Sequence, residues 1–143
     1  MTITSAICNS FKQEILEAEH NFTASSGDTF NLALYDSDAT LNKSTTAYTT
    51  SEELATTGGY TAKGNALTSV TPVLDSDTAV CDFANISWTS ASFTARGCLI
   101  FNDDNSDTSV CAIDFGGDKT VTSGTFTIEF PAAAASTAII QIA

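Results

Sequence analysis

The chain has 143 residues, the length of one ordinary domain, and 43% of them are apolar, which is enough to build a hydrophobic core. Its 17 acidic and 5 basic residues give a net charge of −12, which repels phosphate groups, so neither nucleic acid nor an anionic membrane surface is expected as a partner. The same charge also keeps a protein soluble and does not by itself indicate a cationic partner.

The N-terminal residues MTITSAICNSFKQEILEAEH contain no basic stretch followed by an apolar core, so they do not resemble a signal peptide. No apolar run approaches the roughly 18 residues that a membrane span needs. We therefore expect synthesis in a cytoplasm, where thiols stay reduced. The four cysteines have no C-x-x-C spacing and only one His accompanies them, so neither a zinc site nor a cofactor is expected.

One short amphipathic helix is predicted within about residues 5–22. Ile7, Phe11 and Ile15 recur at intervals of four, and charged residues occupy the other faces, as in a helix with one apolar stripe. This stripe either packs on its own domain or docks on a neighbouring subunit.

The period of the apolar residues changes from about 3.6 to about 2 near Gly27, and residues 28–143 are predicted to form a β-sandwich. Phe30, Leu32 and Leu34 alternate with smaller or polar residues, as in a half-buried strand. Further strands are predicted at 68–74, 80–88, 93–102, 109–115, 124–130 and 138–142. The expected fold class is therefore mainly β: a single antiparallel β-sandwich or barrel-like domain over residues 1–143, with one short N-terminal helix.

Residues 93–117, FTARGCLIFNDDNSDTSVCAIDFGG, predict a hairpin in which two apolar runs flank an acidic loop. A turn centred in this loop places Leu99 opposite Val110 and Cys98 opposite Cys111. Because both faces of the pair carry apolar side chains, we expect it to lie centrally in the fold, covered on both sides. Cys98 and Cys111 are then neighbouring buried thiols and not an obligatory disulfide.

Three loops carry the oxygen ligands that calcium prefers: Asp36 with Asp38, Asp75 with Asp77, and the group Asp103, Asp104, Asn105 and Asp107. An EF-hand counted from Asp103 needs Gly and Glu where Thr108 and Asp114 stand, so that motif fails. Asp and Asn also favour turns because they bond to their own backbone. We interpret all three loops as solvated turns.

No catalytic motif is evident, and the chain is expected not to be an enzyme. His20 is the sole imidazole and lies at the predicted helix end, where a cation interacts well with the helix dipole. No nucleophile motif or paired acid and base accompanies it. Tyr35, Tyr48, Tyr60 and Trp88 are interpreted as core residues, with a platform for stacking sugars as the alternative.

Several segments together resemble a group of small virion structural proteins of tailed bacteriophages, found especially in phages of marine cyanobacteria. The resemblance runs from Phe11 to Ala143. Its segments are HNFTASSGDTFNLALYDSDATLNKSTTAYTTSEELATTGGYTAKG, FTARGCLIFN, CAIDFGGDKT, GTFTIEFP and AIIQIA. The resemblance implies a non-enzymatic component on the surface of the phage particle, most simply a decoration or cement protein bound to the major capsid protein. An accessory protein of the tail, neck or a fibre is the alternative, and a carbohydrate-binding β-sandwich is a more distant one.

A protein of this kind would bind through surface area and symmetry. Closed symmetry is usual in repeated assemblies, so a homo-oligomer is expected, and a trimer if it decorates a threefold site. The first helix and the last strand have the most apolar surface to contribute. The candidate interface residues are Ile7, Phe11, Ile15, Ile140 and Ile142.

Overall fold

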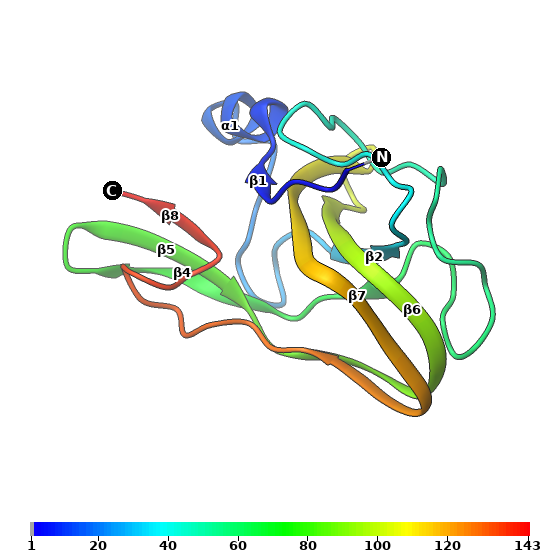
Figure 1. Ribbon diagram of the computed structural model, residues 1–143. Helices are drawn as coiled ribbons and strands as arrows, with labels where there is room; N and C mark the ends of the chain where they lie inside the picture. Colours follow the sequence, from blue (N-terminus) through cyan, green and yellow to red (C-terminus); the bar gives the residue numbers. More distant parts are fainter. Residues whose placement is uncertain (1) are drawn as a thin grey trace.

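Two antiparallel sheets and one short helix make up the computed structural model, which describes residues 2–143 (Figure 1). The larger sheet has the order β1 (Ala6–Ile7), β7 (Thr108–Ile128), β6 (Ile86–Asn102), β2 (Phe30–Tyr35) and β3 (Asn65–Ala66). The smaller sheet has the order β4 (Ser69–Asp75), β5 (Thr78–Phe83) and β8 (Ile140–Ile142). The mainly β, sandwich-like fold class predicted from the sequence is confirmed.

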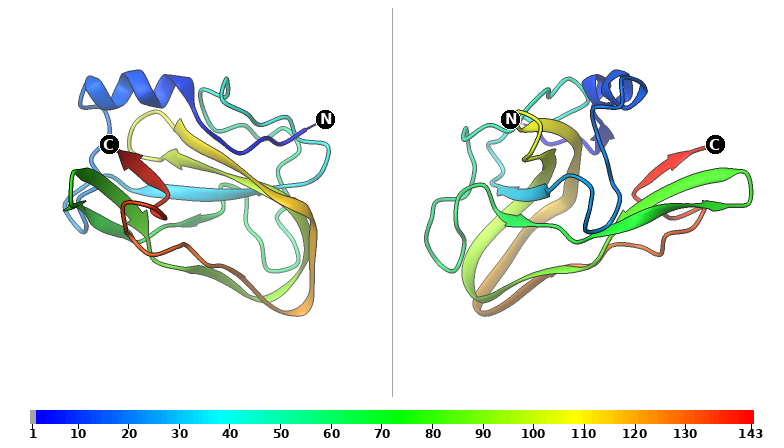
Figure 2. Two further views of the ribbon diagram at one scale, coloured as in Figure 1. Left: turned by 60° about the vertical axis from the view of Figure 1, so that its left-hand side comes forward. Right: turned by 180° about the vertical axis from the view of Figure 1, so that it is seen from behind.

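The long β6–β7 hairpin dominates the fold and folds back on itself, so that its two halves lie in different layers (Figures 1 and 2). The pairing register shifts at several points along it, and Ser90, Gly116 and Ser123 have positive φ angles there. Such bulges let a strand bend without ending. The predicted strand boundaries were therefore wrong here: 80–88 is divided between β5 and β6, whereas 109–115 and 124–130 are parts of one strand, β7.

The predicted register of the hairpin was wrong by two residues. Leu99 pairs with Ala112 instead of Val110, and Cys98 pairs with Ile113 instead of Cys111. The strands close on a turn between Asn102 and Thr108, centred further along the chain than predicted. Since side chains alternate with a period of two, a shift of two leaves each of them on its predicted face.

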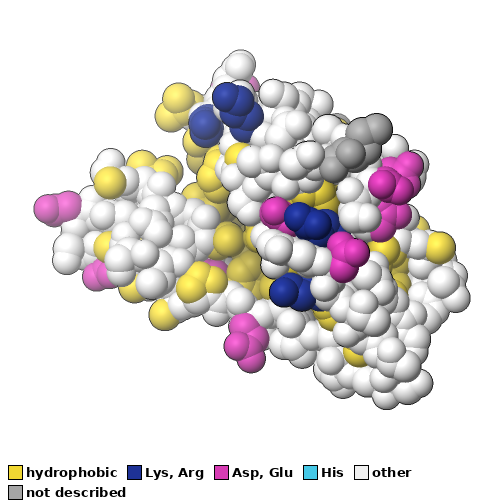
Figure 3. Space-filling view, viewed as in Figure 1, with side chains coloured by type: hydrophobic (Ala, Val, Ile, Leu, Met, Phe, Trp, Pro, Cys, Tyr) yellow, Lys and Arg dark blue, Asp and Glu magenta, His cyan; other side chains and the backbone are white. Residues whose placement is uncertain are grey.

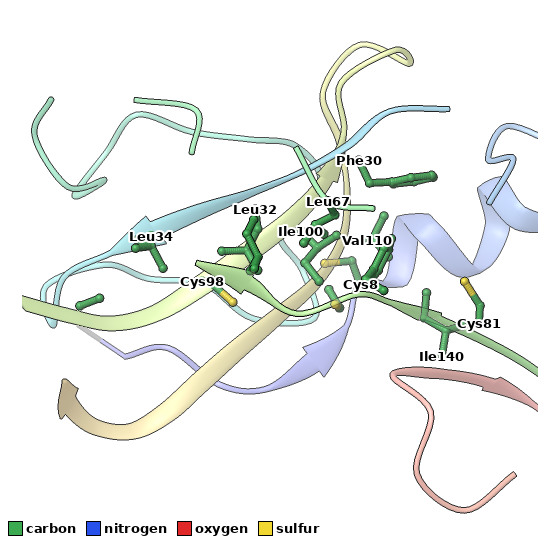
Figure 4. Packing of buried hydrophobic residues seen from close by; sticks show 14 of the residues in the cluster. Cys8, Phe30, Leu32, Leu34, Leu67, Cys81, Cys98, Ile100, Val110 and Ile140 are labelled. Carbon is green, nitrogen blue, oxygen red and sulfur yellow. The ribbon is translucent and has the colours of Figure 1, made fainter. Parts of the chain in front are cut away.

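The predicted central position of the hairpin is correct, because β6 lies between β7 and β2 and is buried on both faces. Cys98 and Ile100 face the main hydrophobic cluster, whose packing is seen in Figure 4. Leu99 and Phe101 face a second, smaller cluster that includes Tyr35. The sequence predicts this double burial because apolar residues occupy consecutive positions of the strand.

The helix α1 (Asn9–Leu16) is shorter than the predicted span of 5–22. The residues ahead of it instead form β1, which pairs with Cys111 and Ala112 of β7 and gains sheet hydrogen bonds. The helix ends where Ala18 takes a positive φ of 60°, a conformation that a helix cannot continue through. None of the helices within residues 2–143 is both long and apolar enough to cross a bilayer.

The three-stranded sheet extends away from the rest of the molecule, and we call it the arm (residues 69–83 and 140–142). Figures 1 and 2 show the β4–β5 hairpin reaching outward, with β8 alongside and α1 above it. The sequence permits β4 at the sheet edge because Pro72, which lacks an N–H donor, is tolerated on edge strands. The edge strand β4 is therefore largely exposed, whereas β5 is buried from Val80 to Phe83.

Candidate interaction surface

An apolar pocket lies between α1 and the arm. Its lining comes from α1, the segment after it, and all three strands of the arm: Ile15, Phe22, Pro72, Ala79, Val80, Cys81, Ile140 and Ile142. Its volume is about 130 Å³. Dry apolar cavities of about 150 Å³ hold a molecule the size of benzene. This pocket can therefore hold one aliphatic or aromatic group.

The register of the arm explains why this pocket is apolar. Leu74, Ala79 and Ile142 lie beside one another across β4, β5 and β8. Cys81 and Ile140 form the next pair on the same face, and Figure 4 shows them close together near α1. We call Pro72, Leu74, Ala79, Cys81, Ile140 and Ile142 the apolar arm face.

Part of this face is open to solvent. Leu74 is 75% exposed and Ile142 is 57% exposed, and Leu16 at the end of α1 is 87% exposed. Val70 and Val73 on β4 are the other large apolar side chains found exposed within residues 2–143. In the view of Figure 3 hydrophobic side chains are scattered singly on the arm and are denser where the arm joins the rest of the molecule. Val70 and Val73 pair with Asp82 and Val80, so they lie on the opposite face of the arm from Leu74. Exposed apolar side chains that lie together, as Leu74 and Ile142 do, are typical of interaction sites in soluble proteins.

The structure brings three of the five predicted interface residues together. Ile15, Ile140 and Ile142 all line the pocket. Phe11 is instead buried in the main cluster, 3% exposed, and Ile7 is half-buried in β1. The helical stripe therefore serves mainly the protein's own core.

Sequence reasoning missed Leu16 and Leu74. Leu16 follows Ile15 directly and so lies off the stripe that the spacing of four selects. Leu74 belongs to a predicted strand, but the sequence does not show that its sheet extends away from the core. One sequence signal was available: Ile15-Leu16 and Val73-Leu74 are adjacent apolar pairs, so each element carries an apolar side chain on more than one face.

The acidic loop of the hairpin is bonded to the chain's own groups. The Lys63 ammonium lies 3.0 Å from a carboxylate oxygen of Asp103 and 2.9 Å from one of Asp107. These hydrogen bonds raise the pKa of Lys63. The Asp104 carboxylate accepts the backbone N–H of Thr29 at 2.6 Å. This loop behaves as the sequence predicts for a turn, with Lys63 as its internal cation.

A separate acidic group forms where β2 meets the long loop that follows it. Asp36, Asp38 and Glu52 each offer a carboxylate oxygen, and these oxygens lie within 4.8 Å of one another. Oxygen donors of this type suit calcium or magnesium. The sequence pairs Asp36 with Asp38, whereas Glu52 is brought to them by the loop.

The aromatic residues considered for sugar stacking do not form an exposed platform. Tyr35, Tyr60 and Trp88 are buried in the two hydrophobic clusters. Tyr48 stacks on the ring of Phe101 at a centroid distance of 4.8 Å. Tyr35, Tyr60 and Trp88 are therefore core residues as predicted, whereas Tyr48 is only partly buried against the smaller cluster.

The face of the arm opposite the apolar arm face carries one buried carboxylate, that of Asp82. Asp82 of β5 is buried, and its Oδ1 accepts the backbone N–H of Phe83 at 2.8 Å, while its Oδ2 has no hydrogen-bond partner. Burial raises the pKa of this carboxyl above its ordinary 3.8.

The four cysteines are free and buried, as expected for reduced thiols. Burial raises the pKa of both Cys81 and Cys111 to about 12, which keeps these thiols protonated and unreactive at neutral pH.

No protein-family model, curated protein sequence or solved structure matches this chain.

Proposed function

We propose that this protein is a non-enzymatic structural component of a tailed-phage particle and decorates the outside of the head shell. The open apolar arm face carries the proposal: Leu74 and Ile142 are exposed on it, and Leu16 is exposed beside it on α1. Exposed side chains of this kind are buried on association with a partner, which suits a protein whose task is attachment. The resemblance to small virion proteins supplies the kind of partner, the major capsid protein.

The charge of the chain fits this location. A net charge of −12 discourages contact with packaged nucleic acid and favours solubility on an outer surface. The arm also offers its pocket to a side chain of the shell, because buried anchors in such pockets dominate binding energy. Attachment then requires no chemistry beyond burial of apolar surface.

Locating the protein in intact particles by electron microscopy tests the proposal. We expect it at regular positions on the outer shell, with the arm turned toward the shell. Density at the neck, tail or fibres would assign it to the alternative accessory role. Failure to sediment with any particle fraction would overturn a structural role altogether.

A binding assay with undecorated shells tests the surface itself. The double variant Leu74→Ser with Ile142→Ser should lower shell occupancy by about tenfold or more, since a central anchor contributes about 2 kcal/mol. Thr122→Ala, an exposed change on β7 away from the arm, is the control and should bind normally. Equal binding of both variants would exclude the arm as the attachment surface.

A further inference from the structure

His20, the only histidine of the chain, is held in the interior between α1 and β6. Its side chain is 0% exposed. The ring lies 4.9 Å from the ring of Phe11, 6.3 Å from that of Phe22 and 6.2 Å from that of Phe30, measured between centroids. Whether a buried imidazole can carry a charge depends on the partners that the fold places at its two ring nitrogens.

Both ring nitrogens have partners from different elements. Nε2 lies 2.7 Å from Oε2 of Glu14 on α1. Nδ1 lies 3.1 Å from Nδ2 of Asn102, the last residue of β6. The imidazole therefore bridges the helix to the central strand of the large sheet.

The orientation of the Asn102 amide is fixed by two further contacts. Its Oδ1 accepts the backbone N–H of Asp104 at 3.1 Å, and its Nδ2 donates to Oδ2 of Asp28 at 2.8 Å. Asn102 is fully buried, so it has no solvent to replace these partners. An N–H donor consequently points at Nδ1 of His20, which must present a lone pair. The ring proton is then on Nε2 and is donated to Glu14.

We propose that His20 is a pH-sensitive latch whose neutral form fastens α1 and the segment 17–29 to β6, and whose protonation releases them. A second ring proton can bind only at Nδ1. There the new N–H of the ring would point at the N–H of Asn102, and two donors cannot form a hydrogen bond. To accept this proton, the amide must turn over and give up its contacts with Asp104 and Asp28, or the ring must leave its site.

The charged groups around the ring come from each neighbouring element. Glu14 faces it from α1, and Asp28 lies beyond Asn102, ahead of β2. Asp104, in the β6–β7 turn, has its carboxylate bonded to the Thr29 N–H. The Asn102 N–H occupies the lone pair of Nδ1, so a proton added there would meet a donor and not one of these carboxylates. The conflict is what makes the contact sensitive to pH.

Release of the latch would alter the apolar pocket. Ile15 on α1 and Phe22 in the segment 17–29 form the side of the pocket that faces the arm. His20 and Asn102 provide one of the connections of both elements to β6, alongside the packing of Phe11 and Phe22, so acidification should loosen this side without unfolding it and leave the arm unchanged.

Nuclear magnetic resonance of the ¹⁵N-labelled ring tests the proposal without ambiguity, because the chain has one histidine. We expect the Nε2–H tautomer at pH 8. Between pH 8 and pH 5, ring protonation should be accompanied by an increase of about tenfold or more in the exchange of α1 amides, corrected for intrinsic rates. Amides of the β6–β7 core, such as Val110, serve as the internal control and should not change. An Nδ1–H tautomer at pH 8, or protonation without faster α1 exchange, would overturn the latch.

Two variants separate the latch from a purely structural role. His20→Gln removes the titrating group, so α1 exchange should lose its pH dependence. Asn102→Asp replaces the donor facing Nδ1 with an acceptor but also sets a carboxylate against Asp28, so it is combined with Asp28→Asn; in this background the protonated ring gains a partner and α1 should be better ordered at pH 5 than at pH 8. If this combined variant instead loosens α1 on acidification as the unmodified protein does, the proposal is wrong. Should either variant fail to fold, the measurements on the unmodified protein decide.

Discussion

Truncation of Phe11 distinguishes a core helix from a docking helix. Its side chain is 3% exposed and packs against the rings of His20 and Phe22, at centroid distances of 4.9 Å and 5.9 Å. Phe→Ala at such a site removes the buried ring and leaves a cavity, at a cost of about 3–5 kcal/mol. For a domain of this size, each kcal/mol lowers the melting temperature by about 2–4 °C, so Phe11→Ala should lower it by roughly 10 °C.

Leu16→Ala is the matched control on the same helix. Leu16 is 87% exposed, so its truncation should change the free energy of unfolding by no more than about 0.5 kcal/mol. Both variants are compared with the unmodified protein by urea unfolding and thermal melting. If Phe11→Ala changes the stability by less than about 1 kcal/mol, the packing of α1 on the core is wrong and the helix is free to dock elsewhere.

Three further predictions concern charge and thiols. Burial raises the pKa of Asp82 in the folded protein, so the contribution of this group to stability should be greatest below pH 3.8. That contribution should decline as the pH rises through the raised pKa. Urea unfolding at several pH values should show this decline, and Asp82→Asn should remove it. Cys98 and Cys111 should stay unbridged in the native protein, and mass spectrometry of unreduced, alkylated samples showing full conversion to a bridge would contradict the structure. The loop 103–107 should bind calcium weakly or not at all while Lys63 neutralises it, and Lys63→Met should increase the calcium response in thermal melting; strong binding by the unmodified loop would contradict this.

The sequence by itself determined the fold class and the central hairpin. Alternation at Phe30, Leu32 and Leu34 predicts β2 because a strand repeats every two residues. Consecutive apolar residues in 98–101 predict a strand buried on both faces, as β6 is. Both inferences rest on the alternation of side chains along a strand, which is the same wherever the strand lies in a sheet. They held even though the register was misjudged by two residues.

Only the tertiary structure decided the bend of the hairpin and the exposure of the candidate surface. Ser90 and Ser123 adopt positive φ angles inside continuous strands, a conformation that serine seldom takes and that its sequence context does not predict. Leu74 resembles an ordinary core residue in the sequence, but the β4–β5 hairpin that carries it extends away from the core, and Leu16 lies on the face of α1 opposite its buried side. Exposure depends on which distant segments cover a residue, and that information is absent from local spacing.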